Sequence, residues 1–314
     1  MNPPTNASTP HRPGEGGAVG GYARQRDGDA VTIEDMVADL RAVGQIDAAL
    51  DECTPLRGSY STVAAVGRAG RPVLVVKANA PGMIAAEAAF LRAYAQVPLL
   101  PRLQYVDSGC RYLAYRYKQG RVSFPPGTKA AALLALVDGL FNRYVRVERG
   151  RGWGRSEDAL TWDEYLRDRV AGARYRLQGR LPAADHAVVA GLLDRPWRRR
   201  LAAAPVYLLH GDCGFHNLLF EGAALTGVID PTPLFGPPIY DLVYAFCSSP
   251  DDLTRETLQL AAARLRGWVP PTPAALWEEA VVGLYCRMGS CLLHHPHDFL
   301  AFLEAWRRWR VLGP

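Results

Sequence analysis

Residues 210–247 read HGDCGFHNLLFEGAALTGVIDPTPLFGPPIYDLVYAFC, and the interpretation of the whole chain starts from this stretch. Two short apolar runs follow Asn217, separated by a segment with the length and the glycine of a hairpin loop. Such a hairpin returns Asp230 to the strand end beside Asn217, and Asp212 lies shortly before it. We therefore expect three oxygen-bearing side chains at one edge of a small sheet, a set that suits Mg²⁺ shared with a phosphate group.

These residue types meet the needs of phosphoryl transfer from a nucleotide. The reaction needs positioning, a cation on the phosphates and a group that receives the proton of the acceptor. Asp212 can orient and deprotonate a hydroxyl, and Asn217 and Asp230 can hold Mg²⁺. Pro231 biases Asp230 toward an extended backbone, which we expect to fix its carboxylate. Either aspartate alone could instead cap a turn or end a strand.

Two charged residues upstream could complete a nucleotide site. Lys77 ends the second strand of a hairpin that the pattern predicts within residues 52–79, where a lysine either reaches solvent or serves a bound anion. Glu87 lies on a helix predicted over residues 83–95 and could be solvated or could pair with Lys77. Together with the downstream motif, we expect Lys77 to hold the α and β phosphates and Glu87 to steady it.

Small residues precede the same hairpin. Gly58, Ser59 and Ser61 lie in the turn before its first strand. Small residues let backbone amides approach phosphate oxygens, although an ordinary turn has the same composition. We expect these three residues to form the phosphate loop.

Composition limits the class of protein. The 314 residues are 49% hydrophobic, enough for a sizeable core, and the formal net charge of +5 is mild. The densest arginine clusters sit at the ends of predicted helices, so we expect no nucleic-acid partner. Six cysteines without CxxC or metal-ligand spacing indicate free thiols in a reducing compartment. With no signal-peptide pattern and no membrane-spanning run, we expect a soluble, cytoplasmic monomer or dimer.

The order of elements predicts an α+β fold with two lobes. Residues 1–30 have the composition of a disordered tail. Residues 31–118 carry most of the strand patterns and form the expected N-lobe, and residues 119–314 form a larger, mainly helical C-lobe. The hinge is expected at the polar, turn-rich segment 119–128. Helical periodicity in the C-lobe covers residues 129–146, 161–178, 184–202, 251–266, 273–290 and 297–311.

The chain resembles the aminoglycoside phosphotransferase and choline kinase group of small-molecule kinases. The resemblance rests on HGD at 210–212 with Asn217 following, IDP at 229–231 and PIYDL at 238–242. It implies a two-lobed, protein-kinase-like fold over about residues 50–314, with ATP or GTP as phosphate donor and Mg²⁺ as cofactor.

The resemblance also implies a role for each motif residue. Asp212 is the implied catalytic base, and Asn217 and Asp230 are the implied metal ligands. Asp241 is implied to support the catalytic loop, and His210 is implied to brace it through hydrogen bonds rather than to carry protons.

The acceptor is expected to be a small molecule. Protein kinases have Asp-Phe-Gly where this chain has Asp230-Pro231-Thr232, and they have a long activation segment that is absent here. Our first expectation is an antibiotic with a sugar hydroxyl, aminoglycoside-like or otherwise sugar-bearing, whose phosphorylation confers resistance. Alternatives are a choline-, sugar- or homoserine-like metabolite alcohol, a nucleotide-binding pseudokinase regulator, and a protein kinase.

The part of the chain after residue 250 leaves the acceptor open. Acidic residues there do not outnumber arginines, whereas a polycationic aminoglycoside would need a pocket rich in carboxylates. Aromatic residues in this region could stack on a sugar, although core packing is their usual role. Those residues are Trp268, Trp277, Tyr285, Trp306 and Trp309. The histidines 294, 295 and 297 could bind a metal, but neighbouring positions on a helix cannot all point one way.

Overall fold

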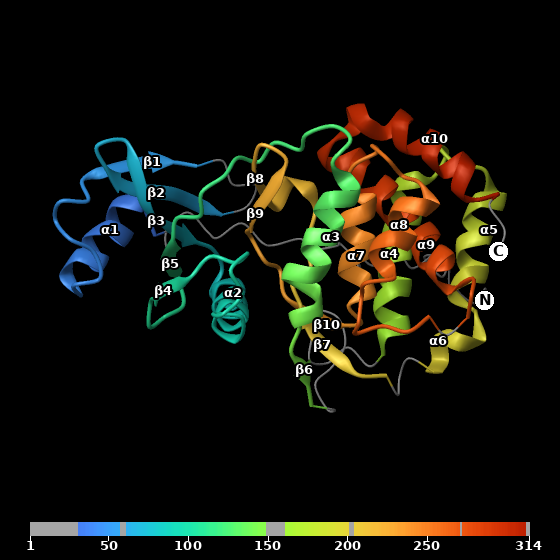
Figure 1. Ribbon diagram of the computed structural model, residues 1–314, viewed down its shortest axis with the longest axis horizontal. Coiled ribbons are helices and arrows are strands. Elements are labelled where there is room, and N and C mark those ends of the chain that lie inside the picture. The colour runs from blue at the N-terminus through green and yellow to red at the C-terminus, as the bar shows by residue number, and fades with distance from the viewer. Residues whose placement is uncertain (1–30, 57–60, 149–160, 201–203, 271, 312–314) are drawn as a thin grey trace, which may run out of the picture.

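The protein is described by a computed structural model that covers residues 31–56, 61–148, 161–200, 204–270 and 272–311. Figure 1 shows a sheet-rich N-terminal part beside a larger, mainly helical C-terminal part. This is the expected two-lobed α+β architecture. The lobe boundary at residues 118 and 119 stays a prediction, and the proposed tail lies outside the described residues.

The N-terminal part is built on a five-stranded antiparallel sheet. Its strands are, in spatial order, β1 (Glu52–Pro55), β2 (Thr62–Arg68), β3 (Arg71–Ala78), β5 (Tyr112–Arg116) and β4 (Leu103–Val106). The predicted hairpin is β2–β3, and its connection is the pair Ala69 and Gly70, with φ of +51° and +69°. Positive φ at both positions matches the right-handed twist of the strands, which makes this a favoured two-residue turn.

One helix covers each face of this sheet. Alternate side chains of β3 point to opposite faces, so that Leu74 packs with α1 (Ile33–Ala42) while Val75 packs with α2 (Pro81–Ala93). The Thr32 hydroxyl and the Asp35 carboxylate cap the start of α1 reciprocally. The two helices therefore hold β3 as the central, buried strand.

The C-terminal part is a bundle of helices. They are α3 (Lys129–Gly139), α4 (Trp162–Leu177), α5 (Ala183–Leu193), α6 (Pro196–Arg200), α7 (Ile239–Cys247), α8 (Arg255–Ala262), α9 (Ala275–His294) and α10 (Phe299–Trp309). Short 3₁₀ turns occupy Phe141–Arg143, Phe215–Asn217 and Pro296–Asp298. The longest, α9, lies against α4, α7 and α10.

Three predicted helices have different limits in the structure. The helix predicted over 129–146 ends at Gly139, since a 3₁₀ turn and strand β6 (Arg146–Val147) follow. The helix predicted over 184–202 is divided into α5 and α6, because Pro196 has no N–H to continue the hydrogen-bond ladder. Helix α8 begins at Arg255, later than predicted, because Thr254 caps it by accepting from the Thr257 N–H.

Two small sheets join the parts. Strands β10 (Leu234–Gly236), β7 (Val206–Leu209) and β6 form one, and the predicted hairpin β8 (Leu218–Glu221) with β9 (Ala224–Val228) forms the other. In Figure 1 this hairpin lies between the N-terminal sheet and the helices. Arg121, in the segment proposed as the hinge, exchanges backbone hydrogen bonds of 2.9 Å with Phe220 of β8.

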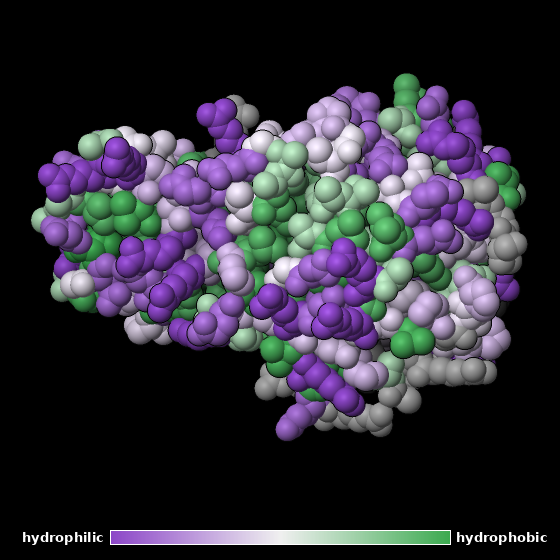
Figure 2. All heavy atoms as spheres, in the orientation of Figure 1, coloured by the Kyte–Doolittle hydropathy of each residue, from purple (hydrophilic) through white to green (hydrophobic). Residues whose placement is uncertain are grey.

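Apolar side chains from both parts form one continuous core. Figure 2 shows hydrophilic residues over much of the visible face, with hydrophobic residues reaching the surface in patches that include the middle of the molecule. Among the described residues, no helix combines the length and the apolar character needed to cross a membrane.

Candidate active site

Lys77 and Glu87 meet because β3 leads almost directly into α2. Strand β3 ends at Ala78 and α2 begins at Pro81, so the second turn of the helix lies over the strand end. Both side chains are buried, and Lys77 Nζ lies 2.5 Å from Glu87 Oε2. The pairing alternative is therefore confirmed for these two residues, and the solvated one is wrong.

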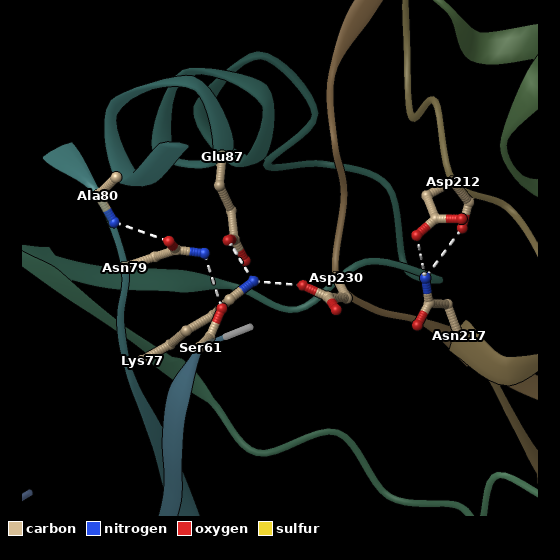
Figure 3. Close-up of polar contacts among 8 residues, drawn as sticks. All are labelled: Ser61, Lys77, Asn79, Ala80, Glu87, Asp212, Asn217 and Asp230. Carbon is tan, nitrogen blue, oxygen red and sulfur yellow. Dashed lines mark hydrogen bonds and ion pairs between the residues drawn. The ribbon is translucent and has the colours of Figure 1, made fainter. Parts of the chain in front are cut away.

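Lys77 also forms an ion pair with Asp230, 153 residues further along the chain. Figure 3 shows its amino group between the carboxylates of Glu87 and Asp230. Burial disfavours the ammonium, but the two carboxylates outweigh burial and raise the pKa of Lys77 above its usual value. One buried cation thus faces two anions, which leaves the cluster with a net negative charge.

Asp230 differs from the other two members of this cluster in its exposure. Its side chain is 54% exposed, whereas those of Lys77 and Glu87 are buried. One carboxylate oxygen, Oδ1, contacts Lys77, and the other has no hydrogen-bond or ion-pair partner among the described residues. Asp230 is therefore the member that solvent or a ligand can reach.

The backbone at Asp230 is not extended as predicted. Its φ is +59°, a conformation that aspartate tolerates better than most residues. The prediction was wrong because hydrogen bonds on both sides hold the chain. The Ile229 N–H donates to Asn217 O and the Thr232 N–H donates to His210 O, both at 2.9 Å. The position of the carboxylate is thus set by these backbone contacts rather than by Pro231.

The β8–β9 hairpin brings Asn217 and Asp230 to one end, as the spacing predicted. Leu218 pairs with Val228, which leaves the two site residues just beyond the paired strands. The Asn217 amide Nδ2 donates to the Asp212 carboxylate Oδ2 at 3.1 Å and to the Asp212 carbonyl at 3.0 Å. Figure 3 shows this pair facing Asp230 and Lys77 across a short gap.

Asp212 has two further partners that the sequence analysis missed. The Tyr244 hydroxyl donates to Asp212 Oδ1 at 2.6 Å, and His216 Nε2 lies 3.4 Å from the same oxygen. Burial raises the pKa of Asp212, but the contacts with His216 and Tyr244 outweigh burial, so the pKa lies well below its usual value. Tyr244 lies three residues after Asp241 on α7, a helical spacing that could have indicated it.

Asp241 binds the backbone that leads into Asp212. It is fully buried and accepts hydrogen bonds from the His210 N–H at 2.9 Å, the Gly211 N–H at 3.1 Å and the Tyr144 hydroxyl at 2.5 Å. Burial raises the pKa of Asp241 to about 6, against these hydrogen bonds. Its contacts agree with the predicted supporting position.

His210 and Gly211 allow the backbone that leads into Asp212 to pack closely against its neighbours. Burial lowers the pKa of His210 to about 4, so the ring is neutral near pH 7, and its Nδ1 accepts from the Asp212 N–H at 3.3 Å. Gly211 has φ of +80°, and a Cβ there would lie 2.1 Å from the Thr232 carbonyl. Only glycine fits this close approach.

The expected phosphate loop is only partly described. Gly58 and Ser59 lie outside the described residues. The Ser61 hydroxyl accepts a hydrogen bond of 2.8 Å from Asn79 Nδ2, directly after β3. Figure 3 shows Ser61 and Asn79 beside Lys77, so Ser61 does lie at the strand end that carries the lysine.

The aromatic residues and the histidines considered as possible binding residues have different surroundings in the structure. Trp268, Tyr285, Trp306 and Trp309 are buried in the core, which confirms the packing alternative for them, and Trp277 is partly buried. His295, His297 and Asp298 bring ligand atoms within 4.8 Å of one another without His294. They come together because α9 ends at His294, so the three residues do not share one helix.

Solved structures with the same fold include several small-molecule kinases. A choline/ethanolamine kinase family protein from Mesorhizobium loti is 19% identical, with a TM-score of 0.57 over 90% of this chain and 95% of that one. A thermostable mutant of the aminoglycoside phosphotransferase APH(4)-Ia, in complex with ADP and hygromycin B, is 18% identical, with a TM-score of 0.57 over 90% and 100%.

A third similar structure is the GDP and kanamycin complex of APH(2″)-IIia, which is 16% identical, with a TM-score of 0.57 over 86% of this chain and 97% of that one. No curated protein matches the sequence. A sequence model described as "Phosphotransferase enzyme family" matches residues 52–280. The chain therefore belongs to this phosphotransferase enzyme family.

Proposed function

We propose that this enzyme transfers the γ-phosphate of ATP or GTP to a hydroxyl of a small molecule in the site formed by Lys77, Asp212, Asn217 and Asp230. One observation carries the proposal. The β8–β9 hairpin and the end of β3 bring Lys77, from the first third of the chain, together with Asp212, Asn217 and Asp230 between the lobes. ADP, AMP-PNP and GDP in the similar structures support a nucleotide donor and leave its base open.

In this proposal Asp212 orients the acceptor hydroxyl and receives its proton. The low pKa of Asp212 makes it a weak base, which suits a reaction whose transition state needs positioning more than early deprotonation. Tyr244 and Asn217 fix the carboxylate from two sides. Asp241 and His210 act through the backbone of the loop and not on the substrate.

Lys77 is proposed to bind the α and β phosphates, with Glu87 holding the ammonium in place. The ammonium has three N–H donors, of which Glu87 and Asp230 use two. Because Asp230 is half exposed and Glu87 is buried, a phosphate can replace the contact of Lys77 with Asp230 while the contact with Glu87 remains. Gly58, Ser59 and Ser61 are proposed to line the same phosphates.

The residues present also fit Mg²⁺, with Asn217 and Asp230 as its proposed ligands. The Asn217 amide nitrogen is engaged by Asp212, so its carbonyl oxygen remains for a cation, and Asp230 keeps one carboxylate oxygen free of Lys77. Such hard oxygen donors are those that Mg²⁺ prefers. When bound, the cation would neutralise negative charge on the phosphate oxygens.

We propose a sugar-bearing antibiotic as the first acceptor to test, with resistance as the biological role. The hygromycin B and kanamycin complexes among the similar structures support this choice. The choline/ethanolamine kinase relative supports the second candidate, a metabolite alcohol. A susceptibility screen of cells that express the chain, followed by mass spectrometry for a gain of one phosphate, distinguishes the two.

Asp212→Asn tests the reaction itself. The variant keeps the shape of the side chain and loses the proton acceptor, so we expect transfer to fall by about 10²–10⁴-fold. Nucleotide affinity, measured by titration calorimetry, should change little. Undiminished transfer by pure variant would refute the role of Asp212. Absence of transfer and of nucleotide hydrolysis in the wild type would favour a pseudokinase, and phosphorylation of a peptide library would favour a protein kinase.

A further inference from the structure

A small cavity lies between α4, α7 and α9, next to Asp212. It encloses about 40 Å³, which is room for one small chemical group and not for a sugar ring. Tyr244 forms part of its wall and donates its hydroxyl proton to Asp212, so the cavity begins one side chain away from the proposed base. The polar lining includes Arg169, Tyr240, Tyr244, Glu279, Arg287 and Ser290.

Two arginines line this cavity without a carboxylate partner among the described residues. Arg287 packs over the ring of Phe302 at 5.4 Å, and its Nε is buried without a hydrogen-bond partner in the described part of the chain. Arg169 packs over the ring of Tyr240 at 5.5 Å, donates a long hydrogen bond of 3.4 Å to the Tyr165 hydroxyl and contacts the thiol of Cys286. Ring contacts satisfy part of the charge without using the N–H donors.

The carboxylate that lines the cavity cannot serve both arginines, because it is already paired. Glu279 Oε1 lies 2.9 Å from Arg198 Nη1, and both residues are buried. The cavity wall therefore has an excess of positive charge. Asp212, on the other side of Tyr244, contacts His216 and Tyr244.

A partly buried guanidinium with a buried, unpaired N–H is costly, and its planar fork of donors fits a carboxylate or a phosphate group in two hydrogen bonds. We propose that the acceptor carries an acidic group, a carboxylate or a phosphate, that binds Arg287 and Arg169 while its hydroxyl lies at Asp212. This inference rests on the proposed function and narrows its acceptor. An acceptor whose charged groups are all ammonium would place like charges together at this cavity.

Matched sugars test the inference, because glucuronate, glucose and glucosamine present the same ring with an acidic, a neutral and an aminated substituent. Glucose 6-phosphate supplies the phosphate alternative. With full-length enzyme and Mg²⁺-nucleotide, we expect kcat/KM for an acidic sugar to exceed that for glucose and glucosamine by roughly 10- to 100-fold, the range for charge-assisted hydrogen bonds. Equal or better use of glucosamine overturns the inference.

Arg287→Gln should remove the preference for an acidic sugar. Arg287→Lys keeps the charge but should retain only part of this preference, since lysine lacks the planar fork. Arg307→Gln, at an exposed position of α10, is the matched control and should behave as the wild type. Unchanged nucleotide affinity in all variants shows that they fold. A preference that survives in Arg287→Gln contradicts the proposal.

A second measurement judges the anion site when none of these sugars is phosphorylated. Sodium sulfate should raise the thermal midpoint more than sodium chloride of equal ionic strength, and this excess should shrink in Arg287→Gln but not in Arg307→Gln. An equal excess in all three proteins overturns the inference. Absence of any Asp212-dependent turnover would instead count against the proposed function, and the sulfate result would still stand by itself.

Discussion

Between the lobes, Lys77 is buried against two carboxylates. In the helical part, Lys129 is buried and Arg169 and Arg287 are partly buried, and none of the three has an ion pair among the described residues. Lys129 donates instead to the backbone carbonyls of Phe246 at 3.1 Å and Ser249 at 2.8 Å. The carboxylates raise the pKa of Lys77, and burial lowers the pKa of Lys129 to about 8.

The difference shows which charge a ligand needs at each of the two sites. Around Lys77 the negative charge exceeds the positive, so the cluster can accept a further cation. Around Arg169 and Arg287 the positive charge exceeds the negative, so that cavity can accept an anion. A positively charged residue therefore has to be interpreted with its partners, because such residues favour opposite ligands in the two places.

Removal of the Lys77 ammonium from its contacts with Glu87 and Asp230 should have the largest effect on stability. Lys77→Met leaves Glu87 buried without its partner, and we expect the free energy of unfolding to fall by about 3–5 kcal/mol. Adding Glu87→Gln should recover much of this loss, because no buried charge then remains unpaired. Transfer should stay low in both variants. Denaturant unfolding and steady-state kinetics measure the two effects, and equal stability of the single and double variants would contradict the assignment.

Lys129→Met, the corresponding change in the helical part, should affect the free energy of unfolding in a pH-dependent way. Folding lowers the pKa of Lys129, whereas it raises the pKa of Lys77. The pKa of Lys129 is lower in the folded protein than its ordinary value of 10.5, so between pH 8 and pH 10.5 the unfolded chain binds more protons. Folded wild-type protein should therefore gain stability, relative to Lys129→Met, as pH rises through this window. The gain is about 3 kcal/mol. Urea unfolding of both proteins at several pH values measures it, and parallel curves would show that Lys129 has no lowered pKa.

Tyr244 connects the two regions, and its removal should have an intermediate effect. Tyr244→Phe removes one hydrogen bond from the partly buried carboxylate of Asp212, an interaction worth about 1.5–3 kcal/mol for a charged partner. We expect transfer to fall by roughly 10- to 100-fold with little change in nucleotide affinity. Because this contact also lowers the pKa of Asp212, the acidic limb of the pH–rate profile should shift upward. An unmoved acidic limb would exclude Tyr244 as a positioning residue.

His216 should have the smallest effect of the residues around Asp212. Its side chain is 41% exposed and its contact with Asp212 is 3.4 Å, so solvent screens the interaction. His216→Gln should change transfer by less than about 5-fold. A loss as large as that of Tyr244→Phe would show that His216 acts directly on the substrate.

Much of this site could be predicted from the sequence because its motifs are local. The hairpin that joins Asn217 to Asp230 and the order of β3 and α2 follow from short-range patterns, and the family resemblance pointed to Asp241. The extended backbone predicted for Asp230 was wrong, because the prediction considered Pro231 and could not include contacts with His210 and Asn217.

What the sequence by itself determined is the family and the two-lobed fold, and it predicted the residues proposed to bind the nucleotide, since periodicity and spacing are properties of neighbouring positions. Only the tertiary structure decided that Lys77 pairs with Asp230, that Tyr244 binds Asp212 and that Arg169 and Arg287 line one cavity. These contacts join positions far apart in the chain. Their electrostatics depend on burial and on the presence of partners, and both exist only after the chain has folded.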